Sequence, residues 1–159
     1  MTDVHVAAPS IEDVADITSL WVALVEDQRE HGAHLLGEEN RADGRAVIEQ
    51  YVHADGLAIA REGEGKLVGF VMFHVERGLY EQDVRRGIVE NVFVVPDRRG
   101  EGIGSRLLDF AESELADRNA AVVALSVLAD NEAALEWYRE RGYHPHRLTM
   151  ERSIDETES

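Results

Sequence analysis

The sequence predicts one α/β (α+β) domain, built on a mixed, mostly antiparallel central sheet of six to seven strands flanked by about four helices. Three observations support this fold class. Segments with apolar residues at helical spacing alternate with short segments of strand character. A glycine-containing turn between two apolar runs indicates a hairpin. The run AVVALSVL at 121–128 is almost continuously apolar, which is typical of a buried central strand.

The first third of the chain predicts a short strand and two helices. Residues 4–9, VHVAAP, form the strand. Ser10 is a suitable cap for the first helix. The apolar residues of that helix are Val14, Ile17, Trp21, Leu24 and Val25. The polar, glycine-interrupted stretch 26–44 predicts a loop or a broken helix, and residues 45–53 predict a second short helix.

The middle of the chain changes to strand character after Gly56. Residues 57–77 contain two strand-like runs around a Glu-Gly-Glu-Gly turn, which predicts a hairpin. Residues 78–87 read as a connecting loop. IVENVFVV at 88–95 is then a strand that Pro96 stops.

The last third alternates helix and strand. Apolar residues recur at helical spacing from Ile103 to Leu115, and the strand at 121–128 follows. A helix is expected at 131–141, closed by a glycine. RLTMERSI at 147–154 predicts a last strand. Since no linker or repeat interrupts this order, we expect a single domain over residues 1–159.

Composition excludes several classes of protein. The absence of cysteine excludes disulfides, thiolate metal sites and a cysteine nucleophile. No apolar run approaches the roughly 18–20 residues that span a bilayer. The start, MTDVHVAAPS, lacks the basic and apolar regions of a secretory signal. We therefore expect a cytoplasmic protein that does not enter membranes.

The charge of the chain is strongly negative. There are 32 acidic and 16 basic residues, a formal net charge of −16, and Lys66 is the only lysine. The electrostatic field of such a negative charge repels nucleic acid and anionic membranes. The acidity has two interpretations, an acidic face for a cationic substrate or a halophilic adaptation to high salt. We favour the second, because the acidic residues are spread along the chain, and we expect the acidic tail from about residue 155 to be frayed.

Three glycines alternate in RRGEGIGSRLL, residues 98–108, directly between a strand and a helix. Glycines at such a turn let the backbone approach a phosphate, and the first N–H groups of the helix then point at it. Arginines could add positive charge at this turn. They are Arg98, Arg99 and Arg106.

The turn does not match two common phosphate-binding motifs. A P-loop needs a Gly-Lys pair, and this turn contains no lysine. A dinucleotide fingerprint has the spacing Gly-x-Gly-x-x-Gly after an early strand, whereas here the spacing is Gly-x-Gly-x-Gly after a late one. A glycine-rich turn with no ligand remains an alternative.

The neighbouring segments add a resemblance to a known family. Arg99-Gly100-Glu101-Gly102-Ile103-Gly104 has the form Arg-x-x-Gly-x-Gly, it follows VENVFVVPD, and NEAALEWYRERGY comes about thirty residues later. This combination resembles the GNAT superfamily of acetyl-CoA-dependent N-acetyltransferases. The resemblance is strong over residues 88–143, and the order of elements extends it to residues 4–154.

The resemblance implies a binding site for acetyl-CoA and no need for a metal. The turn would hold the coenzyme A pyrophosphate, and the strand before it would hydrogen-bond the pantetheine arm and the acetyl carbonyl. The strands at 88–95 and 121–128 would splay apart to admit the cofactor. Asn131 would contact the cofactor, and it can also cap the helix that follows. The expected cofactor-binding residues are Phe93, Val94, Arg99, Gly100, Gly102, Ile103, Gly104, Ser105 and Asn131.

Two residues are candidates for the proton transfers. Tyr138 matches the tyrosine that protonates the leaving thiolate in the family; the alternative is a core aromatic beside Leu135 and Trp137. Glu90, which strict alternation places on one strand face with Val92 and Val94, matches a glutamate that orients or deprotonates the acceptor.

Glu90 also has a structural alternative. An acidic residue inside an apolar strand asks for a partner. An ion pair with Arg85 or Arg86 would explain Glu90 without any catalytic role.

The resemblance leaves the acceptor open. We expect an enzyme that acetylates a primary amine of a small molecule. Ser126 favours the small molecule, since ribosomal-protein N-terminal acetyltransferases carry a glutamate at that position. A protein N-terminal or lysine amine is one alternative, and a non-catalytic acyl-CoA-binding module is another.

The histidines and the sheet edge supply the remaining expectations. The pairs His31/His34 and His144/His146 lack a clear third ligand, so no metal site is expected. His31 and His34 would instead lie in the loop that lines the acceptor pocket. A sheet with an exposed terminal strand would permit a homodimer.

Overall fold

The computed structural model describes residues 3–155, which fold into five strands and four α-helices. The strands are β1 (Val4–Ala7), β2 (Leu57–Glu62), β3 (Leu67–Val75), β4 (Arg86–Val94) and β5 (Val122–Leu125). The helices are α1 (Val14–Arg29), α2 (Arg41–His53), α3 (Ile103–Asp117) and α4 (Glu132–Glu140). Single 3₁₀ turns lie at Ile11–Asp13, Glu38–Asn40 and Pro96–Arg98.

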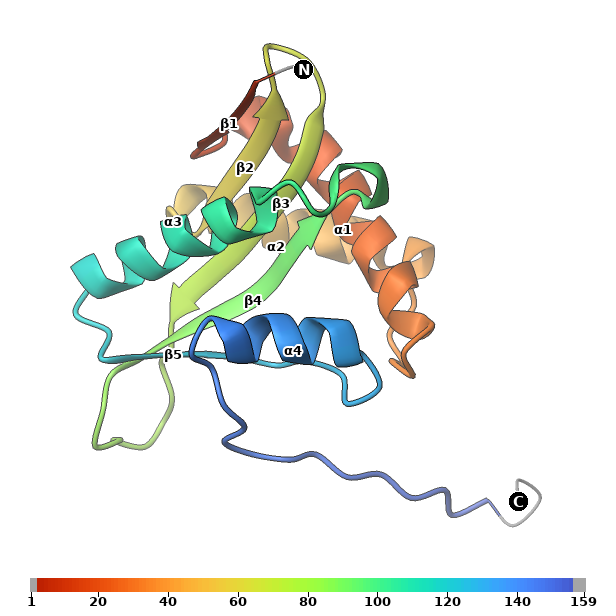
Figure 1. Ribbon diagram of the computed structural model, residues 1–159, viewed down its shortest axis with the longest axis vertical. Helices are drawn as coiled ribbons and strands as arrows, with labels where there is room; N and C mark the ends of the chain where they lie inside the picture. The colour runs from red at the N-terminus through yellow and green to blue at the C-terminus, as the bar shows by residue number, and fades with distance from the viewer. Residues whose placement is uncertain (1–2, 156–159) are drawn as a thin grey trace.

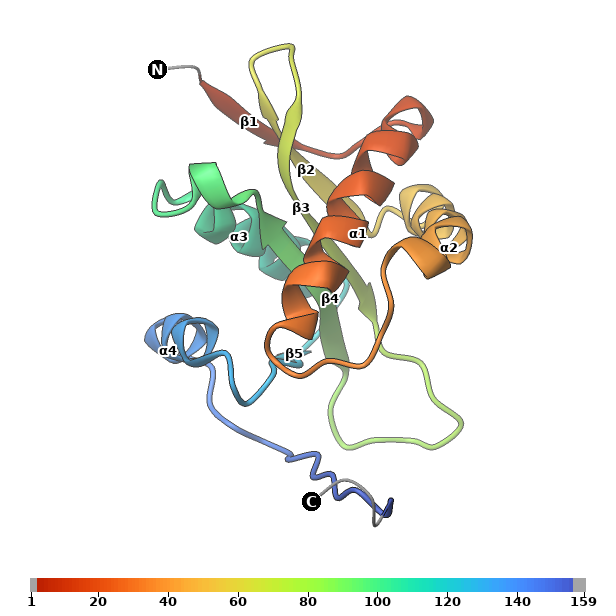
Figure 2. The same cartoon turned by 90° about the vertical axis from the view of Figure 1, so that its right-hand side faces the viewer.

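The strands form one sheet in the order β1-β2-β3-β4-β5, antiparallel except for the parallel pair β4 and β5. Helices cover both faces, with α1 and α2 on one side and α3 and α4 on the other (Figure 2). The core is correspondingly divided in two. The α3 side includes Val71, Phe73, Leu107 and Leu115, and the α1 and α2 side includes Ile17, Ile48, Phe70 and Phe93. This confirms the predicted mixed, mostly antiparallel α/β fold.

The predicted splaying of the strands at 88–95 and 121–128 is confirmed, although the second of them, β5, is a half-exposed edge strand and not the buried central strand that its sequence predicts. Pairing between β4 and β5 ends at Val89 and Leu125, while β4 continues to Val94. The two strands diverge beyond that point, as Figure 1 shows. We call the open side of residues 90–94 the β4–β5 gap.

The predicted strand count was too high. Residues 3–155 hold five strands, not six to seven. The expected strand at 121–128 is limited to Val122–Leu125, since it lies at the sheet edge and pairs with β4 over only four residues. The predicted last strand at 147–154 is wrong, because that extended segment lies beside no other strand (Figure 1). Alternating apolar residues make a segment capable of pairing, but a strand also needs a partner.

Element boundaries differ from the prediction at several helix ends. The second helix begins at Arg41 instead of residue 45, and the first extends to Arg29. At the first helix the backbone N–H of Ser10 donates to Asp13 Oδ2 at 2.9 Å, so Asp13 carries the side-chain part of the cap. Within residues 3–155 no helix is long and apolar enough to cross a membrane. Most of the acidic tail, residues 156–159, lies outside the described part of the chain.

Candidate active site

The glycine-rich turn contains two positions that only glycine adopts easily. Gly100 has φ +81° and Gly102 has φ +82°, in the left-handed region, and Gly102 is the N-cap of α3. A Cβ added at either residue would meet nothing within 4 Å, so the requirement there is conformational. Gly104 is different, because it has ordinary helical geometry. Its added Cβ would lie 3.6 Å from the Trp137 ring and 3.7 Å from Val94 Cγ2.

The N-terminus of α3 presents unpaired backbone donors. The first intrahelical bond runs from Arg106 N–H to the Gly102 carbonyl at 3.1 Å, so the N–H groups of the preceding residues have no helical acceptor. Ile103 is only 3% exposed and therefore offers its backbone alone. The first turn carries no acidic side chain, although a fifth of this chain is acidic. The turn is thus suited to an anion.

The three arginines near the turn have different roles. Arg98 forms ion pairs with Glu62 and Glu101. Arg106 donates to the Val4 carbonyl at 2.9 Å. Both side chains therefore hold the turn and α3 against the sheet, so of the three arginines that could add positive charge at this turn, these two are engaged by the protein itself.

Arg99 is the arginine that faces the β4–β5 gap. Its Nε donates to the Val94 carbonyl at 2.9 Å, and its guanidinium lies 5.5 Å from the centre of the Phe93 ring. The weak ion pair with Asp27, at 3.8 Å, leaves the side chain 46% exposed. Arg99 is thus free to turn toward a phosphate.

The end of β4 directs backbone groups into the gap. The Val95 N–H donates to the Val68 carbonyl at 2.9 Å, toward β3. Because neighbouring residues of a strand direct their backbone groups to opposite sides, the N–H and C=O of Val94 face the gap. Phe93 is 5% exposed and packs in the core below α1 and α2. It supports the strand with its ring, whereas Val94 supplies the accessible polar groups.

Helix α4 forms another wall of the site. Asn131 caps it, with Oδ1 accepting from the Ala134 N–H at 3.1 Å. The Tyr138 ring lies 4.9 Å from Trp137 and 5.8 Å from Tyr143, and burial raises the pKa of Tyr138 to about 12. Tyr138 therefore keeps its proton at neutral pH, as a proton donor must. The expected neighbour Trp137 is found, and Tyr143 completes the aromatic cluster.

Glu90 sits at an irregularity of the sheet. Met72 pairs with Asn91 and Phe73 with Val89, so Glu90 is an extra residue on β4. Such a bulge breaks the alternation of side chains along the strand.

The bulge turns Glu90 toward His74 of β3, with Oε1 3.5 Å from the imidazole Nδ1. The expectation that Glu90 shares a face with Val92 and Val94 is therefore wrong. Those two valines pack on the α3 side of the sheet, whereas His74 contacts α2 on the other side.

The proposed arginine partners of Glu90 are used elsewhere. Arg86 pairs with Glu76, with Nε and Oε1 3.0 Å apart. The Nε of Arg85 donates to the Arg118 carbonyl at 2.9 Å. The structural alternative for Glu90, an ion pair with one of these arginines, is thus contradicted.

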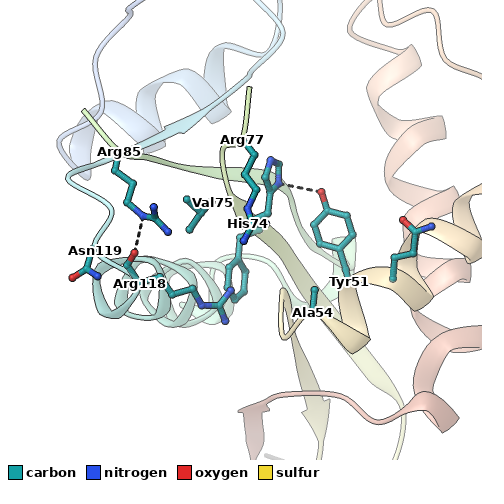
Figure 3. Close-up of a pocket in the computed structure, with 10 residues that line it drawn as sticks. Tyr51, Ala54, His74, Val75, Arg77, Arg85, Arg118 and Asn119 are labelled. Carbon is teal, nitrogen blue, oxygen red and sulfur yellow. Dashed lines mark hydrogen bonds between the residues drawn. The ribbon is translucent and has the colours of Figure 1, made fainter. Parts of the chain in front are cut away.

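Tyr51 and His74 extend the polar cluster around Glu90, and Figure 3 shows the contact between these two side chains. The Tyr51 hydroxyl lies 3.0 Å from His74 Nδ1, and the pKa of Tyr51 is raised by burial and by the charge of Glu90. Both residues line a groove of about 710 Å³, whose lining also includes Arg77, Arg85 and Arg118 (Figure 3). Sequence reasoning missed this cluster, because its members come from α2, β3 and β4 and no motif links them.

The acid and base candidates lie against opposite faces of the sheet. Tyr138 packs with the core on the α3 side, while Glu90 contacts His74 on the α2 side. Strand β4, whose end borders the β4–β5 gap, lies between these two residues. This arrangement allows two reactants to approach one another from the two faces.

The remaining histidines form no such cluster. His34 Nε2 lies 2.9 Å from Glu151, and both side chains are exposed. Within residues 3–155 no group of three or more histidine, aspartate or glutamate side chains is placed to hold a metal ion. That the protein needs no metal stays a prediction.

Comparison with protein families gives one match over most of the chain. The family model described as "Acetyltransferase (GNAT) family" matches residues 15–143. A mycothiol acetyltransferase from Clavibacter sepedonicus is 35% identical over 131 residues, which cover 81% of this chain and 40% of that protein. One from Paenarthrobacter aurescens is 34% identical over 110 residues, covering 67% of this chain and 33% of that protein. The chain therefore spans well under half the length of these curated relatives.

Solved structures resemble the fold over nearly the whole chain. A putative acetyl transferase from Pyrococcus furiosus matches with a TM-score of 0.74 at 26% identity, covering 96% of this chain and 100% of that chain. An aminoglycoside N-acetyltransferase, AAC(6')-Iy, in complex with CoA matches with a TM-score of 0.74 at 16% identity, covering 97% of each chain. At that identity the second likeness concerns the fold alone.

Proposed function

This chain belongs to the acetyltransferase (GNAT) family, and on that premise we propose that it transfers an acetyl group from acetyl-CoA to a primary amine. The observation that carries the proposal is the β4–β5 gap. One end of the gap holds the glycine turn and the N-terminus of α3, and its side presents the backbone groups of Val94. An elongated anionic thioester needs both features, a cradle for phosphates and donors along a strand.

The residues at the turn fit the phosphates of coenzyme A. The first-turn N–H groups of α3 would bind the pyrophosphate, with Arg99 beside them as the mobile cation. Gly100 and Gly102 shape the turn through their left-handed conformation, and neither has a side chain that would occupy the place of the pyrophosphate. The remaining turn residues, Ile103, Gly104 and Ser105, would contribute backbone groups, and Asn131 would line the gap from α4.

Proton movement can be assigned to two groups. Glu90 would accept the proton that the ammonium form of the acceptor must lose before it attacks. The Val94 N–H would donate to the carbonyl oxygen of the acetyl group as negative charge develops there. Tyr138, with its pKa raised to about 12, would donate a proton to the departing sulfur.

His74 and Tyr51 extend the path for the amine proton. His74 Nδ1 lies 3.5 Å from the Glu90 carboxylate and 3.0 Å from the Tyr51 hydroxyl, so one ring nitrogen connects the two side chains. The three side chains would form a polar path from Glu90 to the groove that Tyr51 and His74 line (Figure 3). In this role His74 is a positioning residue, since it acts through Glu90.

The acceptor is proposed to be a small molecule. The curated relatives are named mycothiol acetyltransferases, which gives a precedent among proteins at least 34% identical. Ser126 supports the same choice, because an N-terminal acetyltransferase of the ribosomal type would have a glutamate there. A protein N-terminal or lysine amine remains the alternative, and a cytoplasmic location stays a prediction.

Thiol release from acetyl-CoA, measured with a panel of small amines and amine-bearing peptides, tests the proposal. We expect release that depends on at least one small amine. If the chain binds coenzyme A but no amine stimulates release, it is instead an acyl-CoA-binding module. If peptides alone stimulate release, the acceptor is a protein.

A further inference from the structure

The groove shown in Figure 3 lies beside the end of β3, where that strand extends beyond its neighbour. Strand β2 begins at Leu57, whereas β3 continues to Val75 against β4. The Phe73 N–H still donates to the Gly56 carbonyl, at 2.9 Å. Two residues further on, the Val75 N–H points to the same side, where no residue of β2 lies opposite. Val75 lines the groove, which therefore contains a backbone donor at an open strand edge.

The groove is positively charged, although the protein is strongly acidic. Among the described residues that line it, ten in number, are Arg77, Arg85 and Arg118 and no aspartate or glutamate. In the whole chain 32 of the 159 residues are acidic. We call this feature the arginine groove. Because the net charge of −16 repels an anion from most of the surface, the arginine groove is a local site of attraction for one.

One of the three arginines has a structural role. Helices α2 and α3 both end at the arginine groove, and the C-terminus of a helix attracts a cation. Arg118 follows α3, and its Nη2 donates to the Asp55 carbonyl, just after α2, at 2.6 Å. It also lies 3.5 Å from Glu114 and 5.5 Å from the centre of the Phe73 ring. The two helix ends thus account for Arg118.

The other two arginines keep donors available. Arg77 is exposed and has no hydrogen bond or ion pair with any residue of 3–155. Arg85 uses its Nε toward the Arg118 carbonyl, at 2.9 Å, and the two terminal nitrogens of its guanidinium remain for another partner. Two guanidinium groups and a backbone N–H suit a carboxylate or a phosphate, which accepts several hydrogen bonds at once.

The pyrophosphate of coenzyme A does not account for these arginines. The glycine turn precedes α3, whereas the arginine groove adjoins its other end, and the 15 residues of the helix span roughly 22 Å. The arginine groove is connected instead to the proposed base. His74 lines it, and the Nδ1 of His74 lies 3.5 Å from the Glu90 carboxylate.

We infer that the arginine groove holds an anionic group of the acceptor, so that the acetylated amine belongs to a molecule that also carries a carboxylate or a phosphate monoester. This inference rests on the proposed function, in which the acceptor amine gives its proton to Glu90. A molecule with its amine at Glu90 has its anionic end along the arginine groove. An amine without an anionic group would leave Arg77 and Arg85 without a partner.

The first test compares amines that differ in the anionic group alone. The pairs are glycine and glycinamide, β-alanine and β-alaninamide, γ-aminobutyrate and its amide, and phosphoethanolamine and ethanolamine. Thiol release from acetyl-CoA gives kcat/KM, calculated for the free amine because the two members of a pair differ in basicity. We expect the anionic member to be at least ~10-fold better in one pair or more, as one hydrogen bond to a charged group allows. Equal or better neutral members in every pair would overturn the inference.

Two variants locate the preference. Arg77→Gln and Arg85→Gln should each lower kcat/KM for the anionic member ~5-fold or more and leave the neutral member unchanged. Arg45→Gln is the matched control, because Arg45 is an exposed arginine of α2 that pairs with Glu49 at 3.5 Å outside the arginine groove. Arg77→Gln should also keep the wild-type melting temperature, since Arg77 has no polar partner to lose. A preference that survives both variants would contradict the inference.

A binding measurement separates this inference from the proposed function. Inorganic phosphate or propionate is added to the full chain saturated with coenzyme A, and NMR follows the arginine Nε–H signals, assigned with the variants. We expect the Arg77 signal to shift in a saturable way with at least one anion, while the Arg45 signal stays in place. That shift without acetyl transfer to any amine would support the anion site and reject the proposed function. No shift with either anion would overturn the inference, even if amines are acetylated.

Discussion

Replacing Gly104 or Gly102 by alanine should separate the stability of the glycine turn from its binding of coenzyme A. Gly104 has helical geometry, and its added Cβ would make ordinary contacts at 3.6 Å and 3.7 Å. Gly104→Ala should therefore keep or raise stability, by up to about 1 kcal/mol, since glycine is unfavourable in helices. The same methyl group would stand between Trp137 and Val94, at the side of the β4–β5 gap.

Gly102→Ala should have the opposite profile for stability. At φ +82° an alanine costs about 1–2 kcal/mol. In a domain of this size each kcal/mol corresponds to about 2–4 °C, so the melting temperature should fall by roughly 2–8 °C. Binding should weaken as well, because the strained turn no longer directs its N–H groups at the phosphates.

Calorimetric titration with coenzyme A and a thermal melt of each variant measure the two quantities separately. We expect Gly104→Ala to bind at least ~10-fold more weakly, about 1.4 kcal/mol, with a melting temperature at or above that of the wild type. Wild-type affinity in Gly104→Ala would refute the placement of the cofactor beside Trp137 and Val94.

Three further predictions concern catalysis and charge. Tyr138→Phe should lower kcat by roughly 100-fold and leave coenzyme A affinity unchanged; turnover at more than about half the wild-type rate with chemistry limiting would make Tyr138 a packing residue. Glu90→Gln should lower kcat/KM, while Glu49→Gln, at a half-buried position on α2, should keep the wild-type value; an unchanged kcat/KM in Glu90→Gln would exclude it as the base. The melting temperature should rise with potassium chloride, because salt screens the repulsion within a chain of net charge −16, and a flat or falling curve would favour a local role for the acidic residues.

Raising the pH gives an independent check on Tyr138. Its pKa is raised to about 12 from 10 by burial, so its neutral form stabilises the fold below pH 10. That contribution is lost as the pH rises toward 12. The stability of Tyr138→Phe should therefore fall less than that of the wild type over this range.

The fold could be predicted because its signals are local. The hairpin of β2 and β3 follows from two apolar runs around a glycine turn, and Gly63 in that turn has φ +57°. The glycine turn before α3 could be placed for the same reason. The left-handed backbone at Gly100 and Gly102 favours glycine, and the two glycines are visible in the sequence.

The last strand could not be predicted, because pairing is not a local property. Residues 147–154 alternate as a strand does, yet whether they pair depends on which edge is available. Within residues 3–155 no strand pairs with them. The spacing of apolar residues distinguishes a strand from a helix, but it does not identify the strand with which a segment pairs.

The surroundings of Glu90 also could not be predicted from the sequence. Alternation along β4 puts Glu90 with Val92, but the bulge opposite Met72 and Phe73 turns it to the other face. Its contact with His74 then depends on the register of β3, and that of Tyr51 on the packing of α2. A bulge of this kind has no compositional signature, since it arises from the pairing of two strands.

Acetyl transfer to nitrogen is tested most directly by following the acetyl group itself. The protein is incubated with acetyl-CoA carrying an isotopic label in the acetyl group, together with the amine that gives the fastest thiol release. Mass spectrometry then measures labelled product, and a thiol reagent measures free coenzyme A. We predict one N-acetylated amine for each thiol released, and loss of both signals in Tyr138→Phe with Glu90→Gln. Thiol release at the same rate without any amine, with no labelled product, would contradict the assignment as an N-acetyltransferase.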